Sequence, residues 1–256
     1  MQGFCAVFRK ETGSFFVSPV AYAVIASFLF ISGFFFWANM SFMSLLSLQA
    51  SANPMLAERI NPTDVVVRPL AQNMSIVLLF VMPLLTMRLF SEEKKSGAIE
   101  LLLTYPITDV GVTAGKFLAA AFVLLVMLLG TGTYILLLMA MGRPDLGTVL
   151  TCYLGLFLMG IAFMALGTFI SSLTENQIIS AVVSFGAALL CWILSWTSTI
   201  AGQTAGAVLK QLSILEHMDS FSKGVLSLSD ISFFVLFAAF FLFMTVRSVE
   251  AQRWRG

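Results

Sequence analysis

Charged residues are scarce in this 256-residue chain. Asp, Glu, Lys and Arg make up 11% of it, against roughly 25% in a typical soluble domain, while 59% is hydrophobic and the mean hydropathy is +0.97. A folded surface in water needs polar and ionised groups, and so few charges cannot cover a soluble globule. The composition excludes a soluble fold and predicts a polytopic membrane protein.

Other shortages narrow the functional class. The net charge is +1, so the chain has no basic field for binding nucleic acid. Its three cysteines, Cys5, Cys152 and Cys191, lie far apart, which excludes a disulfide framework and a CxxC metal site. The 25 Phe and 14 Met favour lipid-facing helices over the alternating strands of an outer-membrane barrel.

Six apolar runs approach the length of about 20 residues that a membrane-spanning helix needs. They lie at about residues 17–37, 74–89, 117–141, 146–171, 178–196 and 231–246. The first run is too long for the core of a cleavable signal and has no convincing cleavage site, so we expect it to remain as an anchor. The sequence predicts one all-α transmembrane domain over residues 1–256.

The distribution of basic residues predicts the orientation, because cytoplasmic loops carry an excess of Lys and Arg. With the N-terminus inside, nine basic residues face the cytoplasm and five face out. The nine are Arg9, Lys10, Arg88, Lys94, Lys95, Lys116, Arg247, Arg253 and Arg255, and the five are Arg59, Arg68, Arg143, Lys210 and Lys223. We therefore expect both termini in the cytoplasm.

The segments outside the spans differ in kind. Residues 1–16 place apolar side chains near one face and Arg9 and Lys10 on another, which is typical of a helix in the inner membrane interface, although a simple basic anchor is an alternative. Residues 38–73 show too little periodicity to assign regular structure, and we expect them to form an outer cap of unknown role. Residues 197–230 mix apolar and polar positions, which favours short interfacial or re-entrant helices before the last span.

The predicted spans lack an ionisable side chain near their middle. Ion-coupled carriers usually place Asp, Glu or His there, so an ion-gradient-driven secondary carrier is disfavoured. The segment from Gly111 to Phe117 resembles a phosphate-binding loop, but it is one residue short between its glycines and has Phe where Ser or Thr must bind Mg²⁺. We expect no nucleotide site and no enzymatic activity in this chain.

Charge instead gathers in the predicted cytoplasmic loop at about residues 88–112. Charged residues come first, and Ile99, Leu102 and Leu103 then follow at helical spacing until Pro106. A short amphipathic helix held between two spans is suited to act as a lever, because a partner that grips it can tilt both spans. A solvated connector that obeys the positive-inside rule is the alternative.

This loop resembles the cytoplasmic signature of ABC-2 type exporter permeases. The resemblance rests on Glu92-Glu93-Lys94-Lys95-Ser96-Gly97, then Ile99-Glu100-Leu101-Leu102 and Tyr105-Pro106. Residues 216–225, Asp230 and the closing Arg247-Ser248-Val249-Glu250 are similar to the GldF-like, gliding-motility-associated branch. With six spans at matching spacing, the similarity covers essentially the whole chain.

The resemblance implies a permease subunit of an exporter in the bacterial inner membrane. It implies pairing with a second permease, as a homodimer or heterodimer, contact with lipid, a GldG-like auxiliary protein, and separate ATPase subunits that bind ATP and Mg²⁺. The coupling helix would span about Ser96 to Thr104, and the interfacial helix would also contact the ATPase. A membrane scaffold that uses ATP hydrolysis for mechanical work in a surface or motility machinery is an alternative.

The resemblance also assigns candidate site residues. The ATPase-coupling residues are Glu92, Glu93, Lys94, Lys95, Ser96, Gly97, Ile99, Glu100, Leu101 and Leu102, and those of the interfacial helix are Arg9, Lys10 and Glu11.

Two further patterns have structural alternatives. Ser180, Ser184 and Ala188 recur every four residues, which fits a permease–permease interface or close packing inside one subunit. His217, the only histidine, lies near Glu216 and Asp219, but i, i+1 and i+3 do not converge on one face, so we favour a structural or capping role over a metal site.

Overall fold

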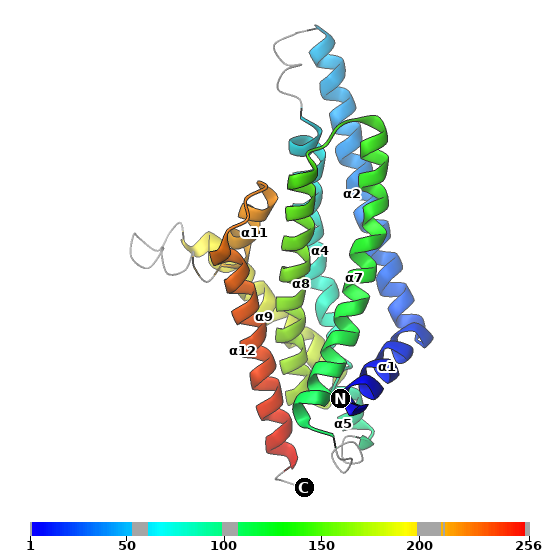
Figure 1. Cartoon of the computed structure of the whole chain (residues 1–256), viewed down its shortest axis with the longest axis vertical. Coiled ribbons are helices and arrows are strands. Elements are labelled where there is room, and N and C mark those ends of the chain that lie inside the picture. Colours follow the sequence, from blue (N-terminus) through cyan, green and yellow to red (C-terminus); the bar gives the residue numbers. More distant parts are fainter. Residues whose placement is uncertain (1, 53–60, 99–106, 199–210, 212, 254–256) are drawn as a thin grey trace.

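The computed structural model describes residues 2–52, 61–98, 107–198, 211 and 213–253 of the protein, and it is all-helical over these ranges (Figure 1). Six helices are long and apolar enough to cross a membrane, as the sequence predicts. They are α2 (Pro19–Ala52), α4 (Arg68–Thr86), α7 (Asp109–Met141), α8 (Leu146–Leu173), α9 (Gln177–Ser198) and α12 (Leu228–Arg253). Shorter elements are α1 (Gln2–Val17), the π-helical turn η1 (Thr63–Val67), α5 (Ser91–Lys95) and α11 (Ile214–Ser222).

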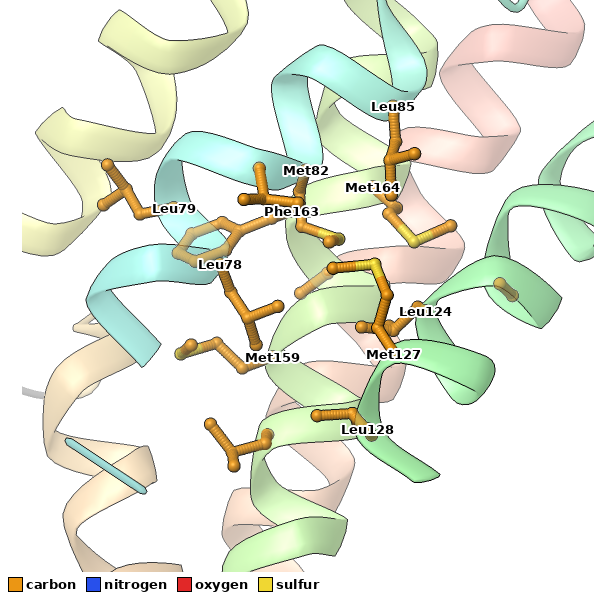
Figure 2. Close-up of a cluster of buried hydrophobic side chains, with 14 of the residues drawn as sticks. Leu78, Leu79, Met82, Leu85, Leu124, Met127, Leu128, Met159, Phe163 and Met164 are labelled. Carbon is orange, nitrogen blue, oxygen red and sulfur yellow. The ribbon is translucent and has the colours of Figure 1, made fainter. Parts of the chain in front are cut away.

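Helix α8 lies at the centre of the bundle and packs against α4, α7, α9, α11 and α12. Within an apolar window of each span, α8 buries 67% of its residues and the span that contains α4 buries 72%, whereas α2 buries only 17%. Figure 2 shows the core, where Leu78 and Met82 of α4 and Leu124 and Met127 of α7 meet Phe163 and other side chains of α8. The outward faces of the peripheral helices are apolar, as a lipid environment requires.

Glycines on α8 allow the neighbouring helices to approach closely. A Cβ at Gly160 would lie 2.6 Å from Leu124 of α7, and one at Gly167 would overlap the Thr86 hydroxyl of α4. Small residues at such crossings are the usual means by which helices associate in lipid, because the backbones can then make close van der Waals contact.

Asp145 caps the N-terminus of α8. Its carboxylate accepts hydrogen bonds from the Thr148 hydroxyl and from the amides of Gly147 and Thr148, each amide at 3.1 Å. These hydrogen bonds, of which the one from the Thr148 hydroxyl has the largest effect, hold the pKa of the Asp145 carboxyl below its ordinary value. The Asp145 amide donates to Thr63 Oγ1 at 2.8 Å, which joins this cap to η1.

Much of residues 38–73, where the sequence shows too little periodicity to assign regular structure, is helical. Helix α2 continues to Ala52, and α4 begins at Arg68, directly after η1. Residues 38–52 contain no Gly or Pro, and the hydroxyls of Ser41, Ser44 and Ser47 bond to carbonyls of their own helix, so nothing local ends α2 earlier.

The length of α2 has a consequence for its placement. Its 34 residues extend roughly 51 Å, which exceeds the hydrocarbon thickness of about 30 Å. Figure 1 shows α2 reaching past the other helices at the end opposite to the marked chain ends and α5.

Candidate functional site

The charged residues of the predicted coupling loop lie at one end of the bundle, where Figure 1 also places α1 and both marked ends of the chain. Helix α1 packs along α7, and α5 contacts α8 and α9. Elements far apart in the sequence therefore meet at this end.

Lys116 of α7 is the centre of this site. Its side chain is only 1% exposed, and its Nζ lies 3.0 Å from Glu11 Oε1 of α1 and 3.0 Å from Glu93 Oε2 of α5. The contact with Glu11 is a hydrogen bond, whereas the geometry of the contact with Glu93 Oε2 is only that of an ion pair. The ammonium also lies 5.4 Å from the centre of the Phe90 ring. One buried cation thus joins α1, α5 and α7.

More exposed charges surround this cluster. Lys10 Nζ donates to Glu93 Oε1 at 3.4 Å. Arg88 lies 3.4 Å from Glu92 and donates to the Ser18 hydroxyl at 3.0 Å. These contacts tie both ends of the turn between α4 and α5 to the N-terminal segment.

The Ser171 hydroxyl holds the turn between α4 and α5. It accepts hydrogen bonds from the amides of Phe90 and Ser91, at 3.1 and 3.2 Å, and donates to the Met87 carbonyl at 3.0 Å. A single side chain at the end of α8 therefore satisfies three backbone groups that this turn leaves free.

The Ser172 carbonyl is a second junction. It accepts hydrogen bonds from Lys94 Nζ of α5, from the Ser248 hydroxyl at 3.3 Å and from the Gln252 amide at 3.0 Å, the last two on α12. This carbonyl lies in the last turn of α8, where the helix dipole favours a cation such as Lys94. Displacement of α5 would therefore act on α8 and α12 as well as on α7.

The structure assigns different positions to the predicted coupling residues. Glu92, Glu93, Lys94 and Lys95 form α5, whereas Ser96 and Gly97 form the turn that ends it, with Gly97 at a φ of +70° that favours glycine. The first two residues of the predicted coupling helix, Ser96 and Gly97, therefore lie in a turn. Ile99, Glu100, Leu101 and Leu102 lie outside the described residues.

The candidates on the N-terminal helix divide similarly. Lys10 and Glu11 belong to the ion cluster, whereas Arg9 is exposed. The sequence interpretation missed the central role of Lys116, although a lone lysine followed by a long apolar run was a visible signal. The roles of Ser171 and Ser172 had no such signal, because they depend on which helix ends meet.

The segment that resembles a phosphate loop is helical. Gly111 to Phe117 forms the first turns of α7, and its lysine is engaged with two carboxylates. A phosphate loop needs backbone amides that point into a loop, whereas here the amide of Gly111 is capped by the Thr108 hydroxyl.

Ser180, Ser184 and Ala188 are each no more than 1% exposed inside the single subunit. Their burial favours the second interpretation of this pattern, which is close packing of α9 within one chain.

His217 joins α11 to α12 at the opposite end of the bundle. Its Nδ1 lies 2.6 Å from Asp230 Oδ1, its Nε2 lies 3.0 Å from the Gln211 carbonyl oxygen, and its ring stacks on Phe233 at 4.0 Å. Asp219, one of the two carboxylates weighed as a metal ligand, pairs with Lys223 instead. The contacts of His217 are those of a residue that fixes two helices together.

Residues 6–249 match the family model described as ABC-2 family transporter protein. No curated protein matches the chain.

Proposed function

Because the chain belongs to the ABC-2 family of transporter proteins, and so is a membrane permease component, we propose that it couples ATP hydrolysis in a separate ATPase subunit to export across the bacterial inner membrane. In this proposal the end that carries α1 and α5 faces the cytoplasm, as the basic residues predict. ATP and Mg²⁺ bind to the partner subunit. A second permease, identical or different, completes the transport path.

The observation that carries the proposal is the pair of partly buried contacts made by α5. Glu93 binds Lys116 of α7, and Lys94 binds the carbonyl at the end of α8. Ionic contacts are stronger where water is excluded. A displacement of α5 by the ATPase would therefore also displace α7 and α8.

The contacts of α1 give the ATPase a second element through which it can act on the transmembrane helices. Glu11 shares the Lys116 ammonium with Glu93, so α1 and α5 are joined through one charge. We propose that α1 lies in the inner membrane interface beside the ATPase and that residues 96–104 form the surface the ATPase grips. A place in the GldF-like branch with a GldG-like auxiliary protein is proposed from the sequence resemblance alone.

Co-purification tests the proposal. We expect the tagged chain, extracted in mild detergent, to retain a phosphate-loop ATPase, and the change Lys95→Glu to reduce this retention because Lys95 is exposed on α5. Arg143→Glu is the matched control, since Arg143 is also exposed but lies just after the other end of α7. Equal retention by both variants, each still monodisperse, would contradict the proposal.

A further inference from the structure

An apolar groove of about 410 Å³ lies between the first turns of α7 and the last turns of α12. Its walls are formed by Val110, Ala114, Leu242, Phe243 and Val246. Val110 and Phe243 are 59% and 51% exposed, so the groove opens on the outside of the bundle. It lies at the same end of the bundle as α5, and the buried Lys116 cluster does not line it.

Two opposite charges stand at the edge of this groove. The Arg247 guanidinium lies over the Phe243 ring at 5.1 Å, and its Nη1 lies 2.7 Å from Glu250 Oε2. Both belong to the last turns of a span, the depth at which lipid head groups lie. The Arg247 side chain is 60% exposed, so its remaining donors are free to meet a ligand.

Thr113 is 2% exposed and lines the groove, and its Oγ1 has no hydrogen-bond partner among the described residues. That hydroxyl is itself buried, so a ligand in the groove meets the apolar wall and the charged edge instead. An apolar wall and a charged edge match the acyl chain and the head group of a phospholipid.

We propose that this groove binds a zwitterionic phospholipid with a primary ammonium, of the phosphatidylethanolamine class. The lipid phosphate binds Arg247, whose planar donors suit phosphate oxygens. The ammonium binds Glu250, and one acyl chain packs against the apolar wall. This site goes beyond the proposed transport function, and only its assignment to the inner leaflet depends on the proposed orientation.

Native mass spectrometry of the purified full chain tests this site. The probes are phosphatidylethanolamine and phosphatidylglycerol with the same acyl chains, supplied at equal concentration. We expect the wild type to retain phosphatidylethanolamine preferentially. Arg247→Gln should weaken its binding about tenfold, which corresponds to about 1.4 kcal/mol, whereas Arg143→Gln, the same change elsewhere, should leave it unaltered.

Two further variants separate the parts of the site. Glu250→Gln should abolish the preference for the ammonium lipid, and Ala114→Phe should lower retention of both lipids by filling the groove. Melting temperatures equal to that of the wild type show that the variants are folded. Equal retention of the two lipids by the wild type, or equal losses in Arg247→Gln and Arg143→Gln, would overturn the proposal.

Discussion

Lys116 shows how one side chain can define a junction between three helices. Its ammonium is 1% exposed and is shared by Glu11 and Glu93, each 13% exposed. A buried ion pair contributes little net stability relative to an apolar replacement of all its members, but removing one member leaves the others as uncompensated buried charges. The cluster therefore specifies how α1 and α5 dock.

The change Lys116→Met should destabilise the protein by about 3–5 kcal/mol, because two carboxylates lose their shared cation. Unfolding of the detergent-solubilised protein would measure this loss, with Lys95→Met as the control at an exposed lysine. Adding Glu11→Gln and Glu93→Gln to Lys116→Met should restore part of the stability. Equal stability of Lys116→Met and Lys95→Met would show that the cluster is not an energetic junction.

Asp145 gives the end of the bundle opposite α5 a defined response to acid. Its pKa in the folded protein is lowered, so the capped carboxylate stabilises the fold above the unfolded-state pKa, and this contribution is lost as the pH falls through the folded-state pKa. We expect the backbone amides in the first turn of α8 to lose protection against hydrogen exchange in acid in the wild type. The Asp145→Asn variant should not show this loss, because its side chain cannot titrate. Hydrogen exchange at Gly147 and Thr148 measures this, and an identical pH dependence in both proteins would be the contrary result.

At the scale of elements, α8 organises the bundle because its glycines admit close neighbours. The change Gly167→Ala should cost about 1–3 kcal/mol, since the new Cβ would overlap the Thr86 hydroxyl. Adding Thr86→Ala should recover much of the loss. Gly132→Ala is the control, because a Cβ there meets nothing within 4 Å, and it should stabilise α7 by roughly 0.5–1 kcal/mol. Similar melting temperatures for the two single variants would contradict this account of the α4–α8 contact.

The spans could be predicted from the sequence because hydropathy alone selects them, and all six are confirmed by helices of sufficient length. Helix ends were less predictable. The continuation of α2 to Ala52 and the start of α4 at Arg68 depend on local bonding that periodicity does not record.

The candidate site was predictable where it depends on local sequence and unpredictable where it depends on packing. The charge run at Glu92 to Lys95 was singled out as the segment that leads into the coupling helix, not as the helix α5 itself. The pairing of Glu93 with Lys116 and the anchoring of Lys94 at Ser172 arise from contacts between distant segments. The turn at Gly97 was also missed, because a glycine after a charge run reads equally well as part of an amphipathic helix.

At the scale of the whole molecule, an even number of spans agrees with both marked chain ends lying on one side of the bundle. We expect a cysteine at position 143 to react with a membrane-impermeant maleimide in intact cells, and one at position 95 to react only after permeabilisation. The background would lack Cys5, Cys152 and Cys191. The reverse labelling pattern would place α5 outside and remove it from reach of a cytoplasmic ATPase.

The most direct test of the central claim is site-specific crosslinking between this chain and its co-purified ATPase. The experiment uses the Lys95→Cys and Arg143→Cys variants of the labelling experiment. Each variant is treated in detergent with a short bifunctional crosslinker. The proposed coupling predicts a crosslinked phosphate-loop ATPase from position 95 and none from position 143. Crosslinking from position 143 alone, or an ATPase that co-purifies without any crosslink at position 95, would contradict coupling through α5.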